Sequence, residues 1–457
     1  MKKILLAIFV VLFCCSLTNL LAQESVGFSN PEDIQPLLDY RLPDWGYSNF
    51  GLDLSHMSSV SDSKYDQRNI SRFSNTIQIS PTYRLYRESE QKILNLFSSV
   101  GLNYNNSKIE SRGYDNSERQ TKNLNIDSQI NISLKNYQSE NIFLYGAGDF
   151  SVTYNRRKNF QPGNTSIGRD VSIKPEIGIG FGRIRNINPM IRAVRLEERL
   201  RAIGQDALNR VQLLNAANQF TKYDGYQKSY DRSEKYFWQD MNRATGSALS
   251  GLKPYDMMYL TDIFDEVIGT RFEGWELIAG VRFRYTNYLD RKDQDSSQGS
   301  TSIIKTIGPY LRGRLYHNIS LNHQIGAFGS LNQSYPLGSS NSAVDYNWNA
   351  STTLGVEWLW TVSDRWFLNT EVRNRYSRIK RTIANDLGSG NSTRWTNNLS
   401  LSSYLTYFLE NKLAITVRFT PFLYHRRGIT SDSKIMTREF DINMSVDVKY
   451  YFIRNLY

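Results

Sequence analysis

The segment NLNIDSQINISL, residues 123–134, alternates polar and apolar side chains, with one exception at Ser128. A period of two indicates a β-strand with one apolar and one polar face. The apolar phase holds Leu124, Ile126, Ile130, Ile132 and Leu134, and the polar phase holds Asn123, Asn125, Asp127, Gln129, Asn131 and Ser133.

The same alternation recurs through residues 46–184 and 275–457. It predicts about fourteen strands of about ten or more residues, which suits tilted strands that cross a membrane. In lipid, every backbone amide needs a partner within the protein, so such a sheet must close on itself. The predicted fold is all-β: a transmembrane antiparallel up-and-down β-barrel.

The connections between these strands alternate in predicted length. Residues 59–69, 106–121, 156–168 and 290–299 form long polar loops, whereas residues 88–92, 138–141 and 410–412 form short turns. Outer-membrane barrels place short turns in the periplasm and long loops outside. With an even number of strands, both chain termini are then predicted to be periplasmic.

Aromatic residues fall at two levels of the predicted strands, which is typical of two membrane–water interfaces. Near the short turns lie Tyr83, Tyr316, Trp358, Trp360, Trp366 and Tyr407, and near the long loops lie Tyr104, Tyr154, Tyr285, Tyr346, Trp348, Trp395 and Tyr424. Four prolines, Pro81, Pro175, Pro309 and Pro421, occupy the lipid-facing phase, where a missing amide predicts β-bulges.

The N-terminus predicts the compartment. Lys2 and Lys3 precede an apolar run over residues 4–15, and Ala22 ends a cleavage site, so residues 1–22 read as a secretory signal peptide. Both cysteines, Cys14 and Cys15, lie inside it, so the mature chain is predicted to have no thiol. Residues 23–45 form a periplasmic N-terminal segment. The predicted location is the outer membrane of a Gram-negative bacterium.

Residues 185–274 interrupt the strand period. Asn188 and Pro189 read as an N-cap and first helical residue. Helical spacing then predicts a periplasmic α-helical insert of four amphipathic stretches, which by default pack on one another. Gly178, Gly180 and Gly182 precede it on the inner phase and leave space near the periplasmic mouth. We expect the insert or residues 23–45 to enter that space as a partial plug.

Two short motifs carry a resemblance. Leu42-Pro43-Asp44-Trp45-Gly46-Tyr47 precedes the first strand, and residues 178–184, GIGFGRI, lead into the insert. In both, the chain resembles a group of uncharacterised, porin-like outer-membrane β-barrel proteins of Bacteroidota-type bacteria. The resemblance implies the fold and the location, and it implies no functional residue.

Charged residues on the polar phase are the candidate pore-lining set: Arg282, Arg284, Arg312, Arg314, Arg373, Arg375, Arg418, Glu176, Glu276, Glu357 and Glu371. Fixed charges in a lumen can select anions or polar solutes. The alternative is a set of structural ion pairs that fill a narrow barrel.

Other kinds of site have weaker support. Glu357 and Glu371 flank a short turn and are expected nearly opposite each other, but Arg373 on the same face favours a salt bridge over acid–base catalysis. The four histidines show no metal-ligand spacing. The sequence therefore predicts no enzyme activity, no cofactor and no metal site. The signal peptide and the lack of a basic stripe argue against nucleic acid.

Three functions remain open. The first is a porin-like channel for small polar or anionic solutes. The second is a barrel-anchored interaction protein that binds a periplasmic partner through residues 185–274. The third is an uptake barrel for hydrophobic compounds, against which the polar inner phase argues. Outer-membrane lipid and lipopolysaccharide are the expected surface partners.

Overall fold

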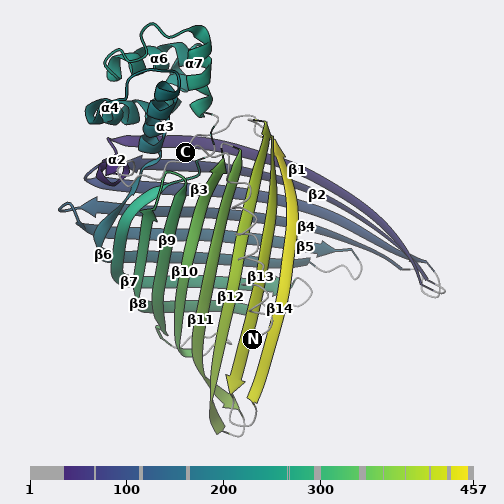
Figure 1. Cartoon of the computed structure of the whole chain (residues 1–457). Coiled ribbons are helices and arrows are strands. Elements are labelled where there is room, and N and C mark those ends of the chain that lie inside the picture. The colour runs from purple at the N-terminus through teal and green to yellow at the C-terminus, as the bar shows by residue number, and fades with distance from the viewer. Residues whose placement is uncertain are drawn as a thin grey trace.

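The computed structural model describes residues 35–450, except 66–67, 113–116, 161–164, 265, 267, 293–299, 339–345, 364, 386–387, 411–412 and 430–433. The predicted signal peptide lies outside the described residues. The chain folds into one antiparallel sheet of fourteen strands, in which each strand pairs with the next along the chain (Figure 1). This confirms the predicted up-and-down order and strand number.

The strands fall into two blocks on either side of the helical insert. The first block is β1 (Trp45–Tyr65), β2 (Arg68–Glu88), β3 (Lys92–Arg112), β4 (Ser117–Tyr137), β5 (Ile142–Asn159) and β6 (Thr165–Asn186). The second is β7 (Phe272–Lys292), β8 (Ser300–Asn318), β9 (His323–Pro336), β10 (Tyr346–Ser363), β11 (Trp366–Asn385), β12 (Gly388–Glu410), β13 (Leu413–Ile429) and β14 (Lys434–Tyr450).

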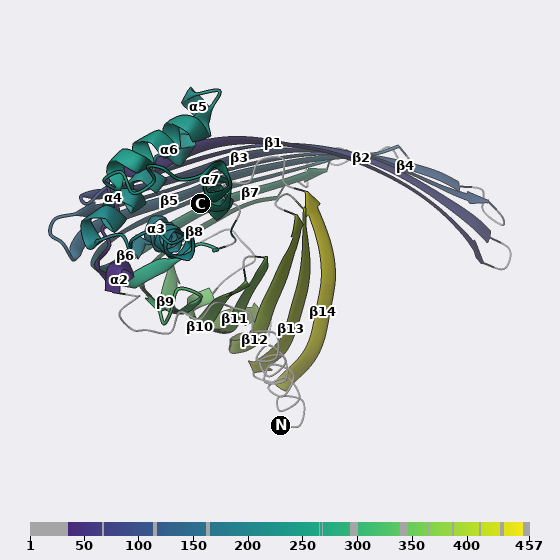
Figure 2. The same ribbon diagram turned by 45° about the horizontal axis from the view of Figure 1, so that its top comes forward.

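The sheet curls, and Figure 2 shows the curvature from β7 to β14. Among the described residues, hydrogen-bonded pairing runs from β1 to β14 and does not join these two edge strands. Closure of the sheet through β14 and β1 stays a prediction.

The strands are longer than predicted because several expected loops are paired. Residues 59–69 were expected as a loop, but β1 and β2 continue through most of this segment, where Ser59 pairs with Ser74 and Tyr65 with Arg68. The same holds for the expected loop over residues 106–121, through most of which β3 and β4 pair. A two-stranded ladder satisfies its own backbone amides, so it can continue where the side chains no longer alternate. The segments expected as long loops are therefore mostly extensions of the paired strands, which end in shorter turns than predicted.

The four prolines do not cause the predicted bulges. At Pro81, the pairing of β2 with β3 stops after Ile79 and resumes at Thr82 in the same register. Equivalent two-residue gaps flank Pro175, Pro309 and Pro421. Each proline still has a register partner on its other neighbouring strand. The missing amide is thus tolerated as a local gap, because the pairs on both sides of it hold the register.

The two faces of the sheet differ as the sequence period predicts. On the outer face, Ile177 is 71% exposed and Leu354 59% exposed. On the inner face, Phe143, Ile278 and Tyr310 are buried in one cluster with Ile93, Tyr137 and Tyr145. Tyr316 and Tyr424 were predicted to belong to the aromatic levels at the two membrane interfaces. This is wrong, since the register puts both side chains on the inner face.

The insert is a helical unit at the short-turn end of the sheet (Figure 1). It contains α3 (Asn188–Ala202), α4 (Arg210–Phe220), α5 (Tyr223–Ser229), α6 (Ser233–Ala244), α7 (Pro254–Thr261) and the 3-10 turn η3 (Asp262–Phe264). These are five α-helices where four were predicted. None of the described helices is long and apolar enough to cross a bilayer.

The described part of the N-terminal segment, residues 35–45, packs on this helical unit. Leu37 in α2 (Gln35–Asp39), Tyr40 and Leu42 are buried in the same core as the insert helices. Leu321, in the turn between β8 and β9, joins that core and so anchors the unit on the sheet.

The predicted partial plug is wrong at Gly180 and Gly178. A Cβ added to Gly180 would lie 2.0 Å from the Phe143 ring, and one added to Gly178 would lie 3.1 Å from the Tyr310 hydroxyl. The Phe143 ring fills the space above Gly180, and the β7 backbone with the Tyr310 hydroxyl fills the space at Gly178, so no part of the insert is needed there.

Candidate functional site

All eleven predicted pore-lining residues lie on the inner face of the sheet. The register places Glu276, Arg282 and Arg284 on β7 in phase with Arg312 and Arg314 on β8. It also places Glu357 directly opposite Glu371, as expected. Arg373, Arg375 and Arg418 follow the same phase on β11 and β13.

The structure brings three of the predicted residues into one cluster. Glu176 on β6 is buried and accepts a hydrogen bond of 2.5 Å from Arg282 Nε. Its other carboxylate oxygen lies 3.3 Å from a guanidinium nitrogen of Arg312. Both guanidinium groups also lie over the Tyr310 ring, at 5.6 and 5.7 Å from its centroid. These contacts are the structural ion pairs that the sequence analysis kept as an alternative.

A polar pocket of about 260 Å³ adjoins this cluster on the inner face. It is lined by Asn95, Phe97, Asn131, Ile132, Ser133, Tyr145, Ala147, Gly148, Asp149, Lys174, Glu176, Arg282 and Arg312. The buried ring cluster borders it through Tyr145. The pocket therefore offers amide, hydroxyl, carboxylate and cationic groups beside an aromatic wall, a lining that suits a small polar solute.

The other predicted residues are dispersed on the second half of the sheet. Arg373 pairs with Glu371 at 2.6 Å, and its side chain is 50% exposed. This contact supports the salt bridge over the acid–base pair. Arg418 lies 4.0 Å from Asp447 and is 47% exposed, and Arg284 donates to Thr286 at 3.1 Å. The inner face is thus closely packed over β3–β8 and more open over β10–β14.

Lys135 is a residue that the sequence analysis missed. It lies on β4 and contacts the buried carboxylate of Glu276 on β7, and its ammonium is 5.5 Å from the centre of the Phe143 ring. The signal was present, because Lys135 extends the polar phase of Asn131 and Ser133. Lys174, Asp149 and Tyr145 in the polar pocket follow inner phases in the same way.

Arg183 makes a second link across the inner face. Its guanidinium donates to the backbone oxygens of Ser89 and Glu90 at 2.9 and 2.8 Å, in the turn between β2 and β3. It also lies 4.4 Å from the centre of the Tyr137 ring. The short-turn end of the first sheet block is therefore held by side chains as well as by the backbone ladder.

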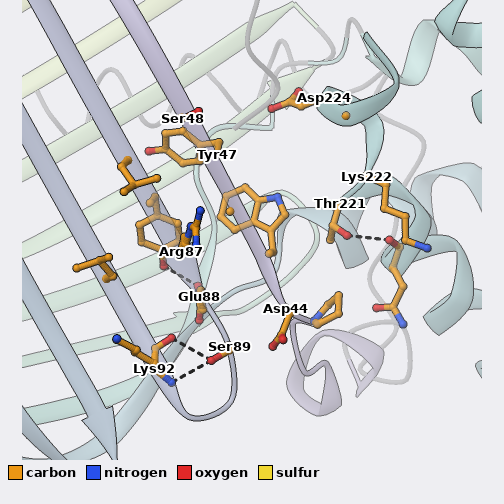
Figure 3. Close-up of a pocket in the computed structure, with 18 residues that line it drawn as sticks. Asp44, Tyr47, Ser48, Arg87, Glu88, Ser89, Lys92, Thr221, Lys222 and Asp224 are labelled. Atoms are coloured by element: carbon orange, nitrogen blue, oxygen red, sulfur yellow. Dashed lines mark hydrogen bonds between the residues drawn. The ribbon is translucent and has the colours of Figure 1, made fainter. Parts of the chain in front are cut away.

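A larger pocket, of about 980 Å³, lies between the start of the β1–β2 hairpin and α4–α5 (Figure 3). Trp45, Tyr47 and Tyr86 form one ring cluster, with centroids 5.4 to 5.7 Å apart. Tyr86 donates a hydrogen bond of 2.6 Å to Glu88. Lys222 and Asp224 face these strands from the helical side. The pocket borders the edge strand β1, and no sequence motif predicted it.

Two residues, Asn188 and Arg271, hold the base of the insert, and Arg271 also joins it to the sheet. Asn188, predicted as a helix cap, instead joins the two ends of the insert: its amide donates to Gly269 O at 2.9 Å and its carbonyl accepts from Arg271 N at 2.7 Å. Arg271 is fully buried and donates to Ile268 O, Asn322 O and Thr361 Oγ1 at 2.8 to 3.0 Å. Burial, with a smaller effect of Arg195, lowers the pKa of Arg271.

The described residues contain no group of three or more histidine, cysteine, aspartate or glutamate side chains that could hold a metal ion. His323 instead stacks with Trp358 and Trp360 on the outer face, with ring centroids 5.9 and 5.2 Å away, and the two indole rings stack with each other at 5.4 Å. This cluster lies at the short-turn end, where an aromatic level was predicted.

Comparisons with known proteins give no family for this chain and only distant structural similarities. It matches no protein-family model and no curated protein. Among solved structures, it is similar to the translocator domain of the autotransporter NalP from Neisseria meningitidis, with 9% identity, 83% of this chain and 93% of that chain covered, and a TM-score of 0.28. It is also similar to the toluene transporter TodX of Pseudomonas putida, with 8% identity, 91% and 94% coverage and a TM-score of 0.29.

A third similar structure is a BenF-like porin from Pseudomonas fluorescens Pf-5, with 8% identity, 89% and 98% coverage and a TM-score of 0.24. At these identities and TM-scores, no property of the three proteins is carried over to this chain.

Proposed function

We propose that the chain is an outer-membrane, porin-like channel for small polar or anionic solutes. The observation that carries the proposal is the contrast between the two faces of one fourteen-stranded sheet. The outer face exposes apolar side chains such as Ile177 and Leu354, which acyl chains would solvate. The inner face carries the polar pocket and the arginine-rich positions.

The inner face suits anions better than cations. Arginine outnumbers glutamate among the eleven candidate residues, and Glu176 is already paired with two guanidinium groups. Arg373 and Arg418 lie near Glu371 and Asp447 but remain about half exposed, and Arg375 is exposed on the same face, so a solute in the lumen still meets cationic groups. Rings of fixed cations select anions by their electrostatic field.

Ion selectivity in planar bilayers tests this proposal. Under a KCl gradient, the wild-type protein should show a reversal potential that favours chloride. Arg373→Gln/Arg418→Gln should shift the potential toward potassium, because two exposed inner-face cations are lost. Arg243→Gln is the control, since this side chain is 80% exposed on the insert. A folded protein that conducts no current would rule out the channel, and an unshifted potential would rule out this role for the inner face.

An interaction role for the insert is the second candidate, and exposed apolar residues favour it. On α7, Tyr255 is 83% exposed and Met258 66% exposed, and on α4, Val211 is 67% exposed. A photo-crosslinker at position 255 in intact cells should capture one defined periplasmic protein if the insert recruits a partner. The same crosslinker at exposed Gln205 should not capture that protein. Equal capture at both positions would reject a specific surface.

Uptake of hydrophobic compounds is the weakest of the three readings. The pocket on the inner face is lined mainly by polar and charged side chains. An apolar solute would have to displace water from these groups without replacing their hydrogen bonds, and this costs free energy.

A further inference from the structure

The outer face carries a group of cations at its hairpin end, opposite the short turns. The group lies on five neighbouring strands, β10 to β14, and we call it the outer cationic band: Arg378, Lys380, Arg427 and Arg438, with Trp395 between Arg378 and Arg427 and Trp348 beside Arg378 on β10. The register assigns these residues to the outer face, because they share the phase of Val372, Leu423 and Phe440. The candidate pore residues occupy the other face, so the band is a separate feature.

The arginines and tryptophans of the band stack side by side. Arg378 is directly opposite Trp395 in the β11–β12 register, and Trp395 is directly opposite Arg427 in the β12–β13 register. The Arg378 guanidinium lies 5.3 Å from the centre of the Trp348 ring and 5.4 Å from that of Trp395. Arg427 lies 5.7 Å from the Trp395 ring. Stacking on indole rings holds both guanidinium groups in defined positions and leaves their N–H donors available.

No acid balances this charge within the described part of the band. The outer phase at this level contains no aspartate or glutamate among the described residues of β11 to β14. None of the four cations forms an ion pair with another described residue, and Arg378, Arg427 and Arg438 are exposed. The nearest acid in the sequence, Glu439, belongs to the inner phase.

The height of the band matches the far boundary of a bilayer. Trp366 begins β11 at the short-turn end, where its ring packs against Tyr407, and Arg378 follows twelve positions later. At ~3.3 Å per residue this is about 40 Å along the strand. With the usual tilt of a barrel strand, it is about 30 Å along the membrane normal, which is the thickness of the hydrocarbon core. The cations then lie at the headgroup level.

We propose that the outer cationic band binds the phosphorylated headgroup of a glycolipid in the outer leaflet. The proposal rests on the outer-membrane location in the proposed function, but not on an open channel. Arginine recognises phosphate oxygens through paired N–H donors, and several cations at one level suit a headgroup with more than one phosphate. Trp395 lies between Arg378 and Arg427, and Trp348 lies beside Arg378, so both rings are placed to contact the sugar and the first acyl carbons.

Retention of defined lipids on the detergent-purified full chain, measured by native mass spectrometry, tests the band. The wild-type protein should retain bisphosphorylated lipid A at least about tenfold better than the same lipid without phosphates. Arg378→Gln/Arg427→Gln should lose about tenfold of this retention. The matched control is Arg426→Gln, since Arg426 is adjacent in sequence to Arg427 but belongs to the inner phase.

Three further measurements complete the test. Migration of unheated samples on a denaturing gel establishes that each variant is folded. Inorganic phosphate at millimolar concentration should not displace the lipid, because the tryptophans also bind its sugar and acyl carbons. Phosphatidylglycerol should be retained more weakly than lipid A, because it offers one phosphate and no sugar.

The following outcomes would overturn the proposal: retention that does not depend on phosphate, equal losses in the Arg427 and Arg426 variants, displacement by inorganic phosphate, or a preference for phosphatidylglycerol. Bilayer conductance of the same preparations separates this proposal from the channel. A conducting protein that retains no lipid A contradicts the band alone, and a non-conducting protein that retains lipid A contradicts the channel alone.

Discussion

Lys135 on β4 contacts Glu276 on β7 across the two intervening strands. Phe143 lies beneath the lysine, and the paired Gly180 leaves room for its ring. A flat sheet would hold β4 and β7 too far apart for this contact, since neighbouring strands lie about 4.8 Å apart. The ion pair is therefore a direct consequence of the curl of the sheet, and it closes the inner face over β5 and β6.

Removal of Lys135 should destabilise the fold. Lys135→Met leaves the Glu276 carboxylate, which is 5% exposed, buried without its cation, and this is expected to cost about 3 kcal/mol of unfolding free energy. Urea unfolding in detergent, followed by tryptophan fluorescence, measures the loss. Lys135→Met/Glu276→Leu should recover at least half of it, because no buried charge remains. Stability equal to wild type in the single variant would contradict the structural role of the pair.

Gly180 should not tolerate a methyl group. The Cβ of Gly180→Ala would lie 2.0 Å from the Phe143 ring, so the ring must move, at a cost of about 1–3 kcal/mol. Gly146→Ala is the control, since a Cβ there meets nothing within 4 Å. The same urea titration compares the two variants. Equal midpoints would show that the ring does not rest on Gly180.

The two faces of the sheet should respond differently to a new charge. Leu354→Arg or Ile179→Arg places a cation on the outer face near mid-membrane and should cost about 2–4 kcal/mol and impair assembly. Asn349→Arg lies on the inner phase and should be tolerated. The yield of heat-modifiable, membrane-inserted protein checks all three. Equal effects at the three positions would discard the assigned orientation.

Arg271 should control how firmly the insert is held. Arg271→Ala removes the two hydrogen bonds that join the insert to Asn322 and Thr361, together with one to Ile268 within the insert, and it should weaken the attachment by about 2 kcal/mol. Limited proteolysis of the segment between α3 and α4 should become faster, while the strands stay protected. Arg243→Gln, on the insert surface, should leave the digestion rate unchanged. If Arg271→Ala is digested no faster than wild type, the attachment does not depend on this residue.

The sequence by itself determined which face of each strand is apolar, how many strands form and where the insert interrupts them. A two-residue period has only two phases, so each side chain is assigned to a face as soon as the strand is located. For this reason all eleven candidate residues lie on the inner face, and Glu357 lies opposite Glu371. Pro189 and the helical spacing of apolar residues likewise predicted four helices of the insert, and α5 is a fifth helix that they did not predict.

The tertiary structure decided everything that depends on distance between non-neighbouring strands. The two-residue alternation predicts that Lys135 and Glu276 lie on the same face, but only the curl of the sheet brings them into contact. It likewise places the Phe143 ring where a plug was expected, and it packs Leu37 and Tyr40 among the insert helices rather than in the lumen. Alternation is a local property of the chain, whereas curvature is set by the packing of side chains from many strands at once.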